Sequence, residues 1–268
     1  MRAHLAGLAI VTLAFSLAAK AAPAGPAGDT TSPQQRTWAG PPPSGAERFL
    51  FDAVNRERAM RGLAELGWNN SLAASARQHA EEMAERNAIS HQFPGEADVA
   101  SRAVQAGARF TALAENVALG PTPSELHQEW MNSAPHRENM LDPNLNAIGI
   151  AVVARGGELF AVQDFSRAVA DLSIEQQEEQ VGELVRSRGL RLATDHDDAR
   201  RACTSGREAG APMRSFYMMR FETDSLDDLP DALNRTIASG RYRQAAIGAC
   251  SDERADGFSS YRLAVVLF

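Results

Sequence analysis

Hydrophobic residues recur at helical spacing along much of the first half of the chain. Each such stretch has a charged opposite face and is bounded by capping residues or by a glycine. The pattern predicts four helices. They span residues 47–62, 72–87, 99–106 and 124–132.

Shorter apolar runs with alternating character follow. Residues 112–119, 147–153 and 159–162 are predicted to form strands. The last two are joined through Arg-Gly-Gly-Glu at 155–158, a sequence typical of a hairpin turn. Helices first and a closing hairpin later predict a layered α+β domain over residues 46–167.

Residues 168–268 predict a separate, small α+β domain of unknown function. Its expected helices span residues 173–187, 199–204 and 229–239, and its expected strands span residues 216–221, 243–249 and 261–268. No sequence repeat links this half of the chain to the first. Nothing in this domain has the pattern of a catalytic site. Residues Asp195 to Asp198 resemble a carboxylate-rich metal clip, but they are more simply explained as the acidic first turn of a helix.

The N-terminus has the pattern of an export signal. A short polar start is followed by an apolar run from Leu5 to Ala19, and a small-x-small cleavage pattern predicts a cut after residue 21. The run is shorter than the ~20 residues that a membrane span needs. Residues 22–45, rich in proline and glycine, predict a flexible linker. The expected location is therefore the periplasm or the extracellular space, with no transmembrane segment in the mature protein.

Charge narrows the range of partners. Removal of Arg2 and Lys20 with the signal changes the formal net charge from −7 to −9, and every remaining cation is arginine. An acidic chain with no basic run is a poor candidate for binding nucleic acid or an anionic membrane surface.

The chain contains two cysteines, Cys203 and Cys250. In an oxidising compartment, a pair this far apart predicts a structural disulfide that ties the second helix of the C-terminal domain to its middle strand.

Three residues of the first domain suggest a metal site. His91 follows the second helix, Glu115 lies in the predicted strand 112–119, and His136 opens a short helix after Pro135. Two imidazoles and a carboxylate form a three-ligand set suited to Zn, with an open position for water. Alternatively, both histidines only hydrogen-bond to Glu115. We expect His136 to stay neutral, because a helix N-terminus disfavours the imidazolium.

Five ordered sequence blocks carry a resemblance to a known family. They are ISH, AENVALG, EWMNSAPHRENML, NAIGIAVV and FAVQDFS, between residues 89 and 166. In order and spacing they resemble the bacterial branch of the CAP superfamily, also called the SCP-like extracellular domain. The resemblance covers residues 46–167 and implies an α-β-α sandwich with a central cleft.

The resemblance also implies site residues. In that family two histidines and two acidic residues face the cleft, and some members bind Zn or another divalent cation there. His91, His136 and Glu115 match three of these positions. The second acidic position is Ser133 here, and Glu129, one helical turn earlier, is an alternative. The predicted cleft residues are His91, Glu115, Asn116, Glu129, Ser133, His136 and Asn139.

Two neighbouring polar groups have structural interpretations. His79, on the buried stripe of the second helix, is predicted to be a packing histidine with satisfied nitrogens. Gln163 and Asp164, near the end of the last strand, are expected to brace the floor of the cleft.

The preferred functional interpretation is a secreted binding module. Its cleft would take a small ligand, a peptide or a cell-envelope component, with or without a divalent metal such as Zn. One alternative is a hydrolase in which Zn activates water, or in which Ser133 is the nucleophile, His136 the base and Glu115 a supporting carboxylate. Another is a scaffold whose C-terminal domain recognises a protein partner.

Overall fold

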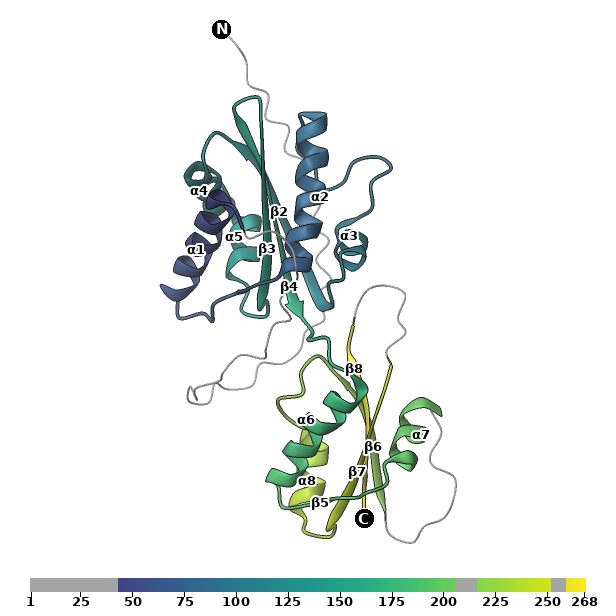
Figure 1. Cartoon of the computed structure of the whole chain (residues 1–268). Coiled ribbons are helices and arrows are strands. Elements are labelled where there is room, and N and C mark those ends of the chain that lie inside the picture. Colours follow the sequence, from purple (N-terminus) through teal and green to yellow (C-terminus); the bar gives the residue numbers. More distant parts are fainter. Residues whose placement is uncertain (1–42, 206–215, 252–258) are drawn as a thin grey trace. The chain divides into compact units, whose positions relative to one another are not determined.

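The computed structural model describes residues 43–205, 216–251 and 259–268. The predicted signal and all but the last residues of the predicted linker lie outside these ranges. Within them the chain forms two four-stranded sheets, each with helices on both faces (Figure 1). The fold is therefore α+β, as predicted, and its first unit is an α-β-α sandwich.

The first sheet contains one parallel and two antiparallel pairings. Its strand order is β1 (Gly67–Trp68), β3 (Ala147–Arg155), β4 (Glu158–Ala168) and β2 (Phe110–Gly120). β1 pairs parallel with β3, and the other pairs are antiparallel. The predicted hairpin joins β3 to β4 through Gly156 and Gly157, both at positive φ. This conformation favours glycine, which explains the turn sequence.

Helices cover both faces of this sheet. They are α1 (Gly45–Ala59), α4 (Pro123–Asn132) and α5 (Ala134–Leu141) on one face, and α2 (Asn70–Arg86) and α3 (Val99–Gln105) on the other. Leu50 of α1 and Trp130 of α4 are fully buried with Ile148 of β3. Ala80 and Met83 of α2 are fully buried in a second cluster on the opposite face.

The close approach of α2 to β3 depends on Gly149. A Cβ at this position would lie 2.0 Å from the backbone nitrogen of Ala73. A side chain is therefore excluded here, and the helix backbone rests directly on the strand.

The second sheet has the order β5 (Arg191–Leu192), β7 (Gln244–Cys250), β8 (Tyr261–Leu267) and β6 (Tyr217–Thr223). Helices α6 (Ile174–Ser187) and α8 (Asp231–Ala238) pack on one face, and α7 (Asp197–Ser205) packs on the other. The predicted disulfide between Cys203 of α7 and Cys250 of β7 is present, with the two Cα atoms 5.8 Å apart.

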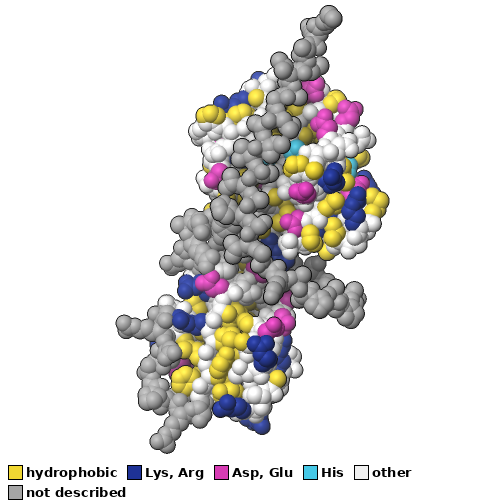
Figure 2. Space-filling model, turned by 180° about the vertical axis from the view of Figure 1, so that it is seen from behind, with side chains coloured by type: hydrophobic (Ala, Val, Ile, Leu, Met, Phe, Trp, Pro, Cys, Tyr) yellow, Lys and Arg dark blue, Asp and Glu magenta, His cyan; other side chains and the backbone are white. Residues whose placement is uncertain are grey.

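None of the helices in residues 43–205, 216–251 and 259–268 is both long and apolar enough to cross a membrane. Side chains of both charges are interspersed over the face shown in Figure 2.

Candidate functional site

The predicted site residues come from three elements around the edge strand β2. His91 lies in the connection between α2 and α3, Glu115 and Asn116 lie in β2, and His136 lies in the first turn of α5. Because the side chains of a strand alternate, Glu115 faces the α2 and α3 side and Asn116 faces the α4 and α5 side.

Glu115 is a buried carboxylate with both oxygens engaged. Its Oε1 is 2.8 Å from Nδ1 of His91, and its Oε2 accepts a hydrogen bond from the Arg102 guanidinium at 2.5 Å. Arg102 is fully buried and also donates to the backbone oxygen of Ala97. Glu115 therefore orients His91 but directs no free oxygen outward.

Asp164 lies directly opposite Glu115 on the neighbouring strand β4. It is fully buried, and neither carboxylate oxygen has a hydrogen-bond partner in the described residues. Burial first, and the negative charge of Glu115 second, raise the pKa of Asp164 well above its ordinary value. The Ser75 hydroxyl is near enough to oppose this shift but makes no hydrogen bond of normal geometry. The arrangement favours the protonated form of Asp164.

Asn116 holds α5 against β2. Its side-chain amide donates to the backbone oxygen of His136 at 3.1 Å and to Oε1 of Gln163 at 3.2 Å. Asn139 of α5 donates to Oδ1 of Asn116 at 2.9 Å. Asn139 thus links the short helix to β2, and Gln163 accepts a hydrogen bond on the same side of the sheet.

His136 is half-buried, and within the described residues its ring makes no hydrogen bond. Burial first, and the positive charge of His91 second, lower its pKa. The direction agrees with the prediction of a neutral imidazole. The causes, however, are burial and His91 rather than the helix N-terminus. Of the two histidines, only His91 hydrogen-bonds to Glu115.

His79 secures the connection that carries His91. It is fully buried, with Nδ1 2.5 Å from Oε1 of Glu96 and Nε2 2.7 Å from the backbone oxygen of Ser90. Both ring nitrogens are therefore satisfied, which confirms the packing role.

Ser133 and Glu129 contribute no contact to the cluster. Ser133 precedes α5 as its N-cap, and its hydroxyl makes no capping hydrogen bond. No hydrogen bond joins it to His136 in the described part of the chain, and the exposed Glu129 carboxylate makes no ion pair there. The geometry gives the serine–histidine hydrolase no support.

The three-ligand metal set does not fit this arrangement. Both oxygens of Glu115 are used by His91 and Arg102. Across residues 43–205, 216–251 and 259–268, no group of three or more His, Cys, Asp or Glu side chains is placed to hold a metal ion. Metal binding stays a prediction, and the groups placed to take part in it are the imidazoles of His91 and His136.

A three-layer sandwich with two histidines beside an acidic edge strand is the arrangement expected of an SCP-like domain. Residues 51–165 match the family described as CAP, the cysteine-rich secretory protein family. The chain therefore carries a bacterial CAP/SCP-like domain. Neither of its two cysteines lies within the matched residues.

A curated relative supports this assignment. YkwD of Bacillus subtilis, described as uncharacterized, is 34% identical over 114 residues, which are 42% of this chain and 44% of YkwD. The chain therefore matches less than half the length of this relative.

Solved structures match a similar share of this chain. An extracellular protein of Bacillus anthracis with an SCP domain is 28% identical, covering 46% of this chain and 40% of that one with a TM-score of 0.43. An outer surface protein of Borrelia burgdorferi is 19% identical, covering 46% of this chain and 92% of that one with a TM-score of 0.44.

Arg102 is the residue of this site that sequence reasoning missed. The available signal was an arginine inside a short predicted helix, a position that is solvated in most proteins. Its partner Glu115 lies on a different element, and only the folded chain brings the two together.

Proposed function

We propose that the chain is an exported binding protein whose CAP domain contacts its ligand through His91 and His136. Relatives with this domain are described as extracellular or outer surface proteins, which supports export. The proposed ligand is a small polar molecule, a peptide or a cell-envelope component.

This proposal rests on how the two histidines are held on opposite sides of β2, each with at least one ring nitrogen left for a ligand. Glu115 is neutralised from inside by Arg102 and fixes Nδ1 of His91, so the Nε2 atom of His91 remains for a ligand. His136 is held in place through its backbone by Asn116, which leaves its ring nitrogens without a partner in the described chain. Two positioned imidazoles can donate to or accept from a polar ligand.

A divalent cation is compatible with this site only if the two histidines share its coordination with a bound ligand or with water. His91 and His136 would supply two imidazole nitrogens, and Zn prefers such ligands. The remaining positions would come from the bound ligand or from water, since Glu115 is occupied by Arg102.

Calorimetric titration of ZnCl₂ into the chain lacking residues 1–21 tests the paired histidines. We expect one saturable site that His91→Ala and His136→Ala each remove. His196→Ala is the matched control, because His196 lies in the second unit with its Nδ1 near the backbone of Ile247.

Zn binding that survives both site substitutions would contradict the role of the pair. If no Zn binds at all, the metal is excluded, and the same variants are then compared for binding to purified cell-envelope fragments. Unchanged binding of both variants to those fragments would overturn the proposed site.

A further inference from the structure

The second unit repeats the topology of the CAP domain. The strand orders are β1-β3-β4-β2 and β5-β7-β8-β6, so each strand of the second sheet corresponds to the strand four places earlier. In both sheets a two-residue strand pairs parallel with its neighbour, and the other pairs are antiparallel. In the first unit α2 and α3 cover one face, in the second unit α7 covers the corresponding face, and the remaining helices pack on the opposite face (Figure 1).

Two glycines align the units residue by residue. A Cβ at Gly248 of β7 would lie 2.2 Å from the backbone nitrogen of Arg200 in α7. Gly149 of β3 meets the backbone nitrogen of Ala73 in α2 in the same way. Gly149 lets the backbone of α2 rest on β3, and Gly248 lets the backbone of α7 rest on β7. Gly248 therefore corresponds to Gly149.

The strand registers then place Arg220 at the position of Glu115. In the first sheet Gly149 is opposite Asp164, which is opposite Glu115. In the second sheet Gly248 is opposite Ala264, which is opposite Arg220 of the edge strand β6. The pair of acids is thus replaced by an alanine and a single arginine, which inverts the charge of the position.

Among the described residues, Arg220 has no neutralising partner. Within residues 43–205, 216–251 and 259–268 its guanidinium makes no hydrogen bond or ion pair, and its side chain is exposed. Glu115, by contrast, is ion-paired with the buried Arg102 of α3.

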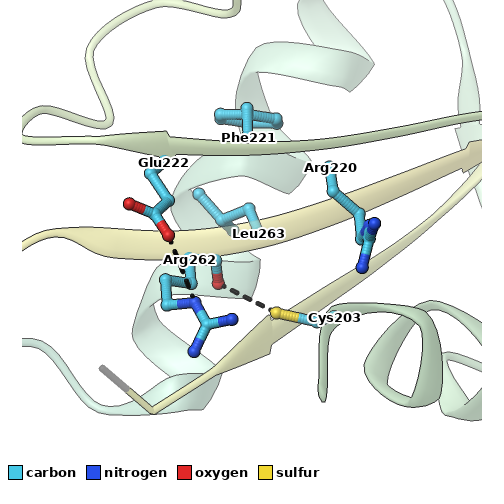
Figure 3. Close-up of a pocket in the computed structure, with 6 residues that line it drawn as sticks. All are labelled: Cys203, Arg220, Phe221, Glu222, Arg262 and Leu263. Atoms are coloured by element: carbon cyan, nitrogen blue, oxygen red, sulfur yellow. Dashed lines mark hydrogen bonds and ion pairs between the residues drawn. The ribbon is translucent and has the colours of Figure 1, made fainter. Parts of the chain in front are cut away.

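Arg220 borders a pocket of about 390 Å³ on the α7 side of the sheet (Figure 3). The pocket is lined by Cys203, Arg220, Phe221, Glu222, Arg262 and Leu263. Figure 3 shows Arg220, Glu222 and Arg262 on the side of the sheet that carries Cys203. The Sγ atom of Cys203 lies 3.2 Å from the backbone oxygen of Arg262, so the disulfide forms a fixed wall.

The second arginine of the pocket is only loosely engaged. Arg262 is 3.5 Å from Glu222, and both side chains are more than a third exposed. Such surface pairs contribute little free energy. A carboxylate placed between the guanidinium groups of Arg220 and Arg262 would therefore meet two donors, one of them free.

We propose that this pocket binds a carboxylate group of an acidic peptide. The site is separate from the histidine pair of the CAP domain, and this inference does not depend on the function proposed for that pair. It assigns the second unit a recognition role at the position where the first unit carries Glu115.

Fluorescence anisotropy with a labelled, end-capped peptide of alternating threonine and glutamate tests the proposal, using the chain without residues 1–21 at low ionic strength. We expect saturable binding that Arg220→Gln weakens by about tenfold or more, because charge-assisted hydrogen bonds are lost. The peptide with glutamine in place of glutamate should not bind.

Arg191→Gln is the matched control. Arg191 is an exposed arginine of β5, at the opposite edge of the same sheet, and its side chain has no partner in the described residues. The proposal is overturned if Arg191→Gln weakens binding as much as Arg220→Gln does. It is also overturned if the glutamine peptide binds equally well, or if the unsubstituted chain binds no glutamate peptide at millimolar concentration. Equal unfolding midpoints for both variants establish that each is folded.

Discussion

Asp164 shows how a single buried carboxyl group can oppose folding. Its pKa is raised in the folded chain because both oxygens are buried without partners beside Glu115. In the unfolded chain an aspartate ionises near pH 3.9. The folded state therefore retains a proton that the unfolded state releases, and stability falls as pH rises from the unfolded pKa towards the folded one.

Asp164→Asn should remove this pH dependence while keeping the shape of the side chain. We expect the variant to be more stable than the parent at pH 7, because an amide has no proton to lose and each unit by which the pKa of Asp164 is raised costs the parent about 1.4 kcal/mol. The difference should shrink towards pH 3, where aspartate is largely protonated in both states. Urea unfolding at the two pH values measures it, and an equal difference at both would show that Asp164 is not the titrating group.

At this scale the sequence predicted part of the site. The resemblance pointed to His91, Glu115 and His136, and the structure places them around β2. It did not reveal Arg102, or that Asp164 faces Glu115, because both facts depend on strand register and on a helix that comes from elsewhere in the chain. Local patterns contain no information about such pairings.

At the scale of elements, α5 is a helix that polar contacts hold in place. Met140 is its single fully buried side chain, and the amide groups of Asn116 and Asn139 link it to β2. A short helix with so little apolar contact depends on these hydrogen bonds for its position.

Asn116→Ala should loosen α5. The substitution removes the donor to the His136 backbone oxygen and the acceptor for Asn139, so we expect a loss of roughly 1–3 kcal/mol in stability. Amide hydrogen exchange of residues 134–141, measured by mass spectrometry, should become faster. Asn144→Ala is the control, since the Asn144 side chain hydrogen-bonds only to Asp142 in its own turn. Unchanged exchange in Asn116→Ala would assign the positioning of α5 to other contacts.

Among the properties of the elements, the ends of the helices were the easiest to predict, because the residues that cap a helix adjoin it in the sequence. Asn69 caps α2 and Gly107 follows α3 with positive φ, within a residue or two of the predicted ends. The two-residue strands β1 and β5 were missed. Each exists through pairing with a strand more than 50 residues later, and neither has an alternating pattern of its own.

At the scale of the whole molecule, the two units share a topology that no sequence repeat revealed. The two units share their strand order, their strand register and one close contact between a glycine and a helix backbone. Sequences with different residues can form all of these features, so no repeat is visible in the sequence. Relative to Gly149 and Gly248, Cys203 and Cys250 take the places of Ala76 and Ala151, two alanines of one buried cluster. A covalent bond in one unit thus replaces apolar packing in the other.

Reduction should therefore affect only the second unit. The described tryptophans, Trp68 and Trp130, lie in the first unit, and all three tyrosines lie in the second. With dithiothreitol, we expect the tyrosine unfolding signal to shift to lower denaturant, since a loop of this size contributes about 3–4 kcal/mol. The tryptophan signal should not move.

A Cys203→Ser, Cys250→Ser double variant is the control for reduction. It should show the same early tyrosine transition with and without reductant. A tryptophan signal that shifts equally on reduction would mean that the two units unfold as one.

The cross-link also has a consequence for where each of the two proposed recognition sites can operate. The histidine pair belongs to a unit without thiols, so it is indifferent to the redox potential of its surroundings. The wall beside Arg220 is itself an oxidised cysteine pair. The arginine pocket would therefore mature only in an oxidising environment. A chain retained in a reducing cytosol would keep the first of the two proposed sites and lose the second.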